Sequence, residues 1–347
     1  MKKMKNRFVM PLILAILAML PLLLAAQPDP QKVTVRVLCA EPIFLEKHYE
    51  QCHASSIVDT GEGLVATWFG GTHERHPDVC IYVARMTDGV WGAPEQVADG
   101  VESELIRNSS WNPVLYQRDN GDLILYYKIG SNPRKWYGVY KVSTDKGKTW
   151  SREQRIPNNL YGPIKNKPVK APDGGILYPT SIEYAPGWKV YVEHSTQELT
   201  RWRKREIDNG QWQAIQPTIL THADGSIQLL CRSKHQRIVE TWSRDGGKTW
   251  SKVDTTSMLN NNSGIDAVSM SNGLHLLIHN PKIKSRSKLA VSVSADGKAW
   301  RELIVLEDHP EGEYSYPAII EGRDGNIHIT YTNRRDNIKY VCLKLEE

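Results

Sequence analysis

The sequence lacks the features of a disulfide-rich, metal-dependent or nucleotide-dependent protein. Its 347 residues include only five cysteines, Cys39, Cys52, Cys80, Cys231 and Cys342, with no CxxC pair and no cluster with histidine at metal-ligand spacing. We therefore expect at most one or two disulfide bridges and no structural zinc. No glycine-rich phosphate-binding loop and no metal-binding motif is present, so we expect no cofactor.

The net positive charge is small once the first residues are set aside. The formal net charge is +5, and Lys2, Lys3, Lys5 and Arg7 supply four of these charges before the first acidic residue, Asp29. The rest of the chain is close to neutral. This removes the electrostatic argument for a nucleic-acid partner.

The only long apolar run lies at the start of the chain. The basic stretch MKKMKNR precedes an apolar run from Phe8 to Leu24 and two small residues, Ala25 and Ala26, which is the pattern of a cleaved secretory signal peptide. A membrane anchor is the alternative, although the run falls short of the ~20 residues that span a bilayer. We expect residues 1–26 to be removed, leaving a secreted or periplasmic protein without a membrane partner.

Long helical periodicity is absent after this leader, and short repeats take its place. The octet STDKGKTW at 143–150 returns as SRDGGKTW at 243–250 and, shortened, as SADGKAW at 294–300. Six glycine turns between apolar strands run in phase with the octets, about 50 residues apart.

Six such hairpins predict six radially arranged blades of four strands. The expected fold is all-β, a six-bladed β-propeller that forms a single domain over residues 27–347, with seven blades as the alternative. We expect the first strand, VTVRVLC, to pair with the last, KYVCLKLEE, because closure of the ring removes exposed sheet edges.

The octets resemble the Asp boxes of the sialidase (neuraminidase) superfamily, and the resemblance covers nearly the whole chain after the leader. Asp145 and Asp245 are expected to accept backbone N–H groups within the turns, while Trp150 and Trp250 pack between strands. These are scaffold roles, and Asp boxes also occur in proteins that are not sialidases. The repeat therefore indicates the fold, and the function has to be sought elsewhere.

The site is expected at the axial mouth, where the innermost strand of every blade begins. Nine or ten residues before the turn glycine, or one or two residues later in the third and fifth blades, lie His53, Asn112, Lys167, Gln216, Asp266 and Tyr316. Buried polar groups cost free energy unless they are paired, so a ring of six indicates a shared site. Arg232 and Arg286 occupy strand positions directed at the same axis, where two guanidinium groups can bind one carboxylate.

The resemblance implies roles for these residues. Sialidases use three arginines for the substrate carboxylate, a tyrosine nucleophile assisted by a glutamate, and an acid/base aspartate in a loop of the first blade. Arg232 and Arg286 match the second and third arginines, and Tyr316 matches the nucleophile. His53 stands in place of the first arginine, and Gln216 in place of the assisting glutamate.

Further departures affect the bracing and acid groups. Thr332 stands where a glutamate would brace the first arginine, and only GGTHERHPD matches the acid/base loop, with Glu74 or Asp78 as the acid. An amide cannot accept a proton from a phenol near neutral pH, so Gln216 cannot activate Tyr316 as a glutamate would. We expect His53, the nearest candidate base by register, to lie beside Tyr316.

Two reactions fit these residues. In the first, an exo-acting glycosidase binds the carboxylate of a terminal sialic or uronic acid and uses Tyr316 or water as the nucleophile. In the second, a uronate lyase uses the arginines to acidify the C5 proton, which His53 or Tyr316 removes; an unperturbed histidine pKa near 6.5 favours His53 as the base. We favour the first, a sialidase-like hydrolase with an acidic oligosaccharide as its partner.

A third reading is a propeller that binds glycans without turnover. Its support is the tryptophans near the mouth, Trp68, Trp111, Trp136 and Trp188, which would stack on sugar faces. The expected site residues are Tyr316, His53, Glu74, Asp78 and Gln216 for catalysis, and Arg232, Arg286, Asn112, Lys167, Asp266 and Trp111 for substrate binding.

Overall fold

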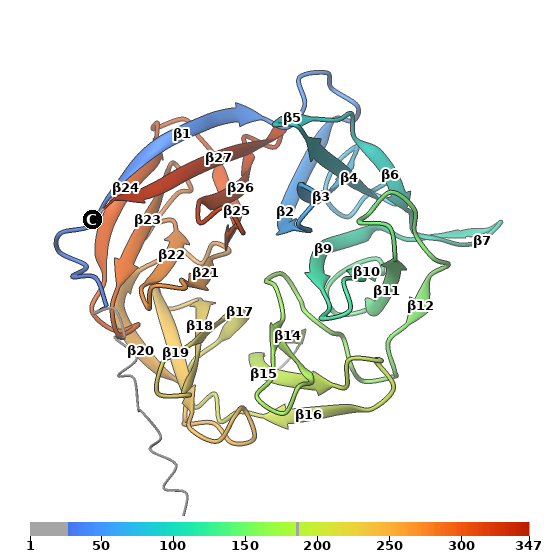
Figure 1. Ribbon diagram of the computed structural model, residues 1–347. Coiled ribbons are helices and arrows are strands. Elements are labelled where there is room, and N and C mark those ends of the chain that lie inside the picture. Colours follow the sequence, from blue (N-terminus) through green and yellow to red (C-terminus); the bar gives the residue numbers. More distant parts are fainter. Residues whose placement is uncertain (1–26, 185–186, 347) are drawn as a thin grey trace, which may run out of the picture.

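The computed structural model describes residues 27–184 and 187–346 and confirms the six-bladed β-propeller, with six sheets arranged around a central axis (Figure 1). The regular elements in this part of the chain are all strands. No helix among these residues is long and apolar enough to cross a membrane. The expected signal peptide, residues 1–26, lies outside the described residues.

The first three blades follow the chain order from the axis outward. Blade 1 contains β2 (Gln51–Asp59), β3 (Leu64–Gly71), β4 (Cys80–Thr87), β5 (Val90–Trp91) and β6 (Glu95–Ala98); blade 2 contains β9 (Ser110–Gln117), β10 (Leu123–Ile129), β11 (Tyr137–Ser143) and β12 (Gln154–Arg155); blade 3 contains β13 (Val169–Lys170), β14 (Ile176–Tyr184), β15 (Gly187–Ser195) and β16 (Trp202–Glu206). A small hairpin, β7 (Val101–Ser103) and β8 (Ile106–Arg107), lies between blades 1 and 2.

The other three blades repeat this plan. Blade 4 contains β17 (Ala214–Thr221), β18 (Ile227–Ser233), β19 (Arg237–Ser243) and β20 (Asp254–Leu259); blade 5 contains β21 (Asp266–Ser269), β22 (His275–His279), β23 (Lys288–Ser294) and β24 (Arg301–Asp308); blade 6 contains β25 (Tyr314–Glu321), β26 (Ile327–Asn333), β27 (Asn337–Glu346) and β1 (Thr34–Pro42). Apolar side chains of neighbouring sheets pack together to form the core. Between blades 5 and 6, for example, Leu276 and Ile278 pack with Ile327 and Ile329.

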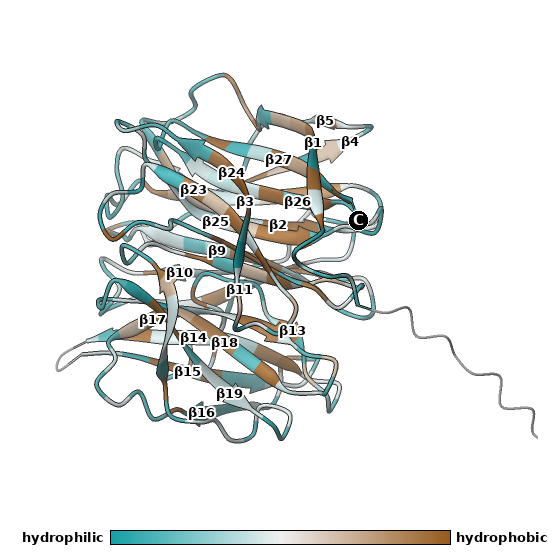
Figure 2. Cartoon of the chain, turned by 90° about the vertical axis from the view of Figure 1, so that its left-hand side faces the viewer, coloured by the Kyte–Doolittle hydropathy of each residue, from teal (hydrophilic) through white to brown (hydrophobic). Residues whose placement is uncertain are grey.

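The ring closes where the sequence predicts. β1 pairs antiparallel with β27 from Thr34 opposite Glu346 to Pro42 opposite Lys339, and Figure 1 shows the two strands, blue and red, side by side. All five cysteines are free, although Cys39 and Cys342 are partners in this register. Figure 2 shows brown, hydrophobic segments along the strands and teal, hydrophilic segments in many of the loops at their ends.

The innermost strands carry a repeated irregularity near their starts. Ala54, Asn112, Gln216 and Tyr316 have positive φ angles of 59°, 39°, 52° and 51°, and the register of each inner strand with its neighbour shifts at this point. Each lies nine residues before its turn glycine, so these bulges are equivalent. A bulge of this kind re-aims a side chain where a strand approaches a site.

This register corrects three members of the expected ring. The same nine-residue spacing selects Lys165 in blade 3 and Gly264 in blade 5, rather than Lys167 and Asp266. In blade 1 it selects Ala54, so His53 lies one residue outside the equivalent position. The sequence analysis allowed a variable offset, whereas the bulges fix the offset at nine residues.

Candidate active site at the axial mouth

Tyr316 lies at the centre of the candidate site. Its hydroxyl oxygen accepts hydrogen bonds from Arg232 Nη1 at 2.9 Å and from Gln216 Nε2 at 3.3 Å. Arg232 Nη1 also donates to Gln216 Oε1 at 3.1 Å, while its Nε donates to Asn262 Oδ1 at 2.9 Å. Three predicted site residues from blades 4 and 6 are thus joined in one hydrogen-bond network.

His53 packs against Tyr316, as predicted from their register. The ring centroids are 4.2 Å apart, the His53 side chain is buried, and its Nδ1 has no hydrogen-bond partner among the described residues. Burial lowers the pKa of His53 well below its ordinary value, and the positive charges of Arg335 and Arg286 lower it further. The imidazole is therefore neutral at pH 7 but is a weaker base than an unperturbed histidine, which corrects the sequence-based argument.

The two expected arginines meet at the same tyrosine. Arg232 Cζ lies 5.7 Å and Arg286 Cζ 5.5 Å from the centroid of the Tyr316 ring. Arg286 Nη1 forms an ion pair with Glu313 Oε1 at 3.0 Å, which holds the guanidinium group at the mouth. The predicted convergence of these arginines is confirmed, and their role as a carboxylate clamp stays a prediction.

A third arginine, Arg335, was missed by the sequence analysis. It lies in the turn between β26 and β27, and its carbonyl oxygen accepts a hydrogen bond from the backbone N–H of Cys52, next to His53, at 2.9 Å. Its Nε lies 3.3 Å from Glu313 Oε1 and its Nη1 3.0 Å from Glu74 Oε2. Arg335 therefore brings positive charge to the place where His53 replaces an arginine.

The two expected loop acids behave differently. Glu74 is paired with Arg335, so its carboxylate belongs to the mouth. Asp78 accepts a hydrogen bond from the backbone N–H of Thr72 at 3.0 Å and lies 2.8 Å from His76 Nδ1. Burial raises the pKa of Asp78, but the hydrogen bonds from Thr72 and His76 outweigh it and leave the pKa below its ordinary value. Asp78 thus shapes the loop and is a poor proton donor.

Asp266 and Lys167 brace the blades below the mouth. Asp266 accepts hydrogen bonds from Lys167 Nζ at 2.8 Å, from Thr218 Oγ1 at 2.8 Å and from the Ile319 N–H at 3.0 Å. These contacts join blades 3, 4, 5 and 6 at the axis. Because the carboxylate is already occupied, the expected substrate-binding role of Asp266 and Lys167 is not supported.

Lys165, the true ring member of blade 3, crosses the axis beneath Tyr316. Its buried ammonium group donates to Asn166 Oδ1 at 2.8 Å, to the Ile265 carbonyl at 3.2 Å and to the Pro317 carbonyl. Burial lowers the pKa of Lys165 to about 7. Lys165 thereby fixes the backbone directly after Tyr316.

The expected sugar-stacking tryptophans are mostly part of the core. Trp111 is 2% exposed and donates from Nε1 to the Gly130 carbonyl at 2.7 Å, packing edge-on against Trp136. Trp68 is fully buried and stacks on Phe44. The prediction that sugars stack on Trp68 or Trp111 is therefore wrong, because neither ring face is accessible. The neighbour of Trp111, Asn112, is also buried.

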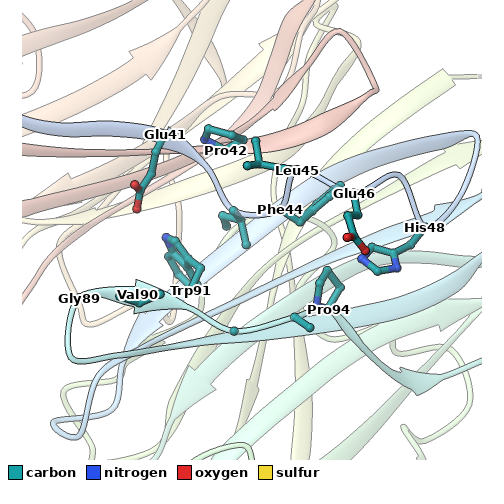
Figure 3. Close-up of a pocket in the computed structure, with 13 residues that line it drawn as sticks. Glu41, Pro42, Phe44, Leu45, Glu46, His48, Gly89, Val90, Trp91 and Pro94 are labelled. Atoms are coloured by element: carbon teal, nitrogen blue, oxygen red, sulfur yellow. The ribbon is translucent and has the colours of Figure 1, made fainter.

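A separate pocket of about 380 Å³ lies at the rim, between the end of β1 and the segment from Gly89 to Pro94 (Figure 3). Phe44 and Trp91 give it apolar walls, and Glu41 and Glu46 place two carboxylates on its lining. Like charges repel, so this pocket is unsuited to an acidic sugar and is not part of the axial site.

Comparison with known proteins agrees with this architecture. The BNR repeat-like domain family matches residues 62–329, which is most of the chain. The protein belongs to this family. A search of curated protein sequences finds no match.

Several solved structures share the fold of this BNR repeat-like protein. A protein of unknown function from Dyadobacter fermentans superposes with a TM-score of 0.75 at 15% identity, covering 90% of this chain and 99% of that one. The NanB sialidase from Streptococcus pneumoniae gives 0.69 at 12% identity, covering 86% and 70%. The intramolecular trans-sialidase from Ruminococcus gnavus gives 0.69 at 14% identity, covering 87% and 96%. The likeness confirms the sialidase-like fold.

Proposed function

We propose that this protein is a glycoside hydrolase that removes a terminal acidic sugar from a glycan. The observation that carries the proposal is the convergence of Arg232, Arg286 and Arg335 on the Tyr316–His53 pair. Three guanidinium groups favour a ligand with a carboxylate, because each can donate charge-assisted hydrogen bonds to it. The fold shared with sialidases supports the same class of reaction.

In the proposed reaction, Tyr316 is the nucleophile. Its oxygen bonds to the anomeric carbon as the bond to the leaving oxygen breaks, and its proton passes to His53. Bound substrate assists this transfer, because its carboxylate offsets the arginine charges that lower the pKa of His53. Water then attacks the anomeric carbon, and as the bond from that carbon to Tyr316 breaks, the tyrosine oxygen takes back the proton from His53.

Hydrolysis is favoured over elimination by the surroundings of His53. Elimination requires a base strong enough to remove a proton from carbon, and burial together with the neighbouring arginines makes His53 a weak base. The nucleophilic route makes a smaller demand, because the phenol proton is far more acidic than a proton on carbon.

The test is turnover of a panel of sialosides and uronate-terminated oligosaccharides. Hydrolysis releases a free acidic sugar and a new reducing end. Elimination instead gives an unsaturated uronate, which is detected by its ultraviolet absorbance. Release of an acidic sugar supports the proposal, the unsaturated product supports the lyase, and binding without any product supports a glycan-binding propeller.

We also propose that the leader directs secretion, which N-terminal sequencing of the exported protein would test.

A further inference from the structure

Glu183 brings a carboxyl group to the mouth that none of the roles above explains. It is the penultimate residue of β14, which runs from a turn on the opposite face toward the mouth. Two residues earlier, Ser181 Oγ accepts a hydrogen bond from the Gln216 N–H at 3.0 Å. Side chains alternate along a strand, so Glu183 lies on the same face of β14 as Ser181, toward blade 4, and one step nearer the mouth.

The charges around Glu183 come from two sides. Arg232 and Lys234 face it from blade 4, and Glu74 and Arg75 from the loop after β3. Lys234 is already engaged, because its Nζ donates to Gln213 Oε1 at 2.9 Å and lies 4.3 Å from the Trp188 ring centroid. Within the described ranges, the half-buried Glu183 carboxyl has no hydrogen-bond or ion-pair partner.

The other carboxyl groups of the site already have ion-pair or hydrogen-bond partners. Glu74 pairs with Arg335, and Glu313 with both Arg286 and Arg335. Asp78 is tied to its loop and Asp266 to Lys167. Burial raises the pKa of Glu183 above its ordinary value; Arg232 partly offsets this, and the nearby negative charge of Glu74 adds to it. Of these groups, Glu183 is thus the best suited to carry a proton near neutral pH.

We propose that Glu183 is the general acid that protonates the leaving oxygen, an assignment that rests on the proposed hydrolase function. In a 2-keto sugar acid, the carboxylate and the leaving oxygen are substituents of one carbon. Because Arg232 is one of the charges that face Glu183, we place the Glu183 carboxyl on the side of the leaving oxygen when the arginines hold the carboxylate. As the bond from the anomeric carbon breaks, its electron pair stays on the leaving oxygen, which takes the Glu183 proton and departs as an alcohol.

The experiment compares wild type with Glu183→Gln on two 2-ketosides of the same acidic sugar. One is a glycan whose leaving group is a sugar alcohol, and the other is a 4-methylumbelliferyl glycoside, whose leaving phenol is a much stronger acid and needs little protonation. We expect kcat/KM to fall by about 10²–10⁴-fold on the glycan and far less on the aryl glycoside. The decline of the wild-type rate at high pH should also disappear in the variant.

Glu206→Gln is the matched control, because Glu206 is an exposed glutamate on the outermost strand of the same blade, 3.1 Å from Lys204. It should keep the wild-type rates on both substrates. Equal losses of Glu183→Gln on both substrates, or none, would overturn the general-acid role while leaving the hydrolase proposal standing. If wild type hydrolyses neither 2-ketoside but cleaves uronosides, the general-acid argument fails alone; if it turns over no acidic glycoside, both proposals fail.

Discussion

The two ends of the blades use their polar residues in opposite ways. At one end are the box turns, residues 143–150, 243–250 and 294–300. In the first two, the Asp145 and Asp245 carboxylates accept hydrogen bonds from the following threonine N–H at 2.8 and 2.9 Å and from the threonine hydroxyl at 2.6 Å in both. Almost the same geometry is built twice from almost the same sequence.

At the mouth, the equivalent inner-strand positions hold different residues, and some polar atoms of the residues around them have no partner. Ala54, Asn112, Gln216 and Tyr316 share a left-handed backbone conformation that is uncommon for residues other than glycine. His53 Nδ1 and the Glu183 carboxyl lack partners among the residues described. Strain and unpaired groups of this kind gather at functional sites. The repeated end is scaffold, and the varied end is where chemistry is expected.

The largest expected effect comes from Tyr316→Phe. Loss of the hydroxyl removes the proposed nucleophile but leaves Arg232 and Gln216 bonded to each other at 3.1 Å, so the fold should persist. We expect turnover of the acidic glycan to fall by about 10²–10⁴-fold, and His53→Ala to show a loss in the same range. Steady-state rates measure the loss, and an unchanged melting temperature is the control. Wild-type rates in both variants would remove this pair from the mechanism.

The next effect concerns binding and tests the arginine that the sequence analysis missed. Arg335→Ala should weaken binding of the released acidic sugar by about 2–5 kcal/mol, because it removes a partly buried cation and leaves Glu74 and Glu313 less well paired. Calorimetric titration measures this change. Arg334→Ala is the matched control, since Arg334 lies in the same turn but donates to the Tyr314 hydroxyl at 3.2 Å. Equal effects of the two variants would argue against a specific clamp.

These two variants also mark how far sequence reasoning reaches. The hairpins, the blade number and the β1–β27 closure followed from local patterns, because a tight turn between apolar strands is encoded within a few residues. The count back from the turn glycine placed Gln216 and Tyr316 correctly. In blade 3, where the first strand has only two residues, the variable offset that the sequence analysis allowed selected Lys167 instead of Lys165. Arg335 and Glu183 lie near the mouth ends of second strands, outside the repeats, so only the closed ring brings them to the site.

Acid should affect the two ends over different pH ranges. His279, at the mouth end of β22, is buried, and burial lowers its pKa to about 4. A histidine with a lowered native pKa costs stability as pH falls below its unfolded value near 6.5, because only the unfolded chain then gains the proton. Between pH 7 and 4.5 we expect wild type to lose about 2.5 kcal/mol through this residue.

The comparison is His279→Gln, which keeps a polar side chain near Ser292 Oγ, 3.2 Å from His279 Nε2 in the wild type. Urea denaturation at the two pH values should show a smaller loss of stability in this variant than in wild type. His48→Gln, at an exposed histidine, is the control and should follow wild type. Identical pH dependence in wild type and His279→Gln would show that this residue does not contribute.

The smallest effect is expected from Asp245→Ala in a box turn. The exposed Asp245 carboxylate is held by hydrogen bonds from the Thr249 hydroxyl and N–H, which keep its pKa below its ordinary value. Its contribution to stability is therefore present above pH ~4 and fades as pH falls further. We expect a modestly lower melting temperature at pH 7, a smaller difference from wild type in acid, and an unchanged kcat, because the turn lies on the face opposite the mouth. Asp245→Asn, which keeps one acceptor oxygen, should fall between the two. A loss of kcat without a loss of stability would mean that the repeated end takes part in function, and the contrast between scaffold and site would no longer hold.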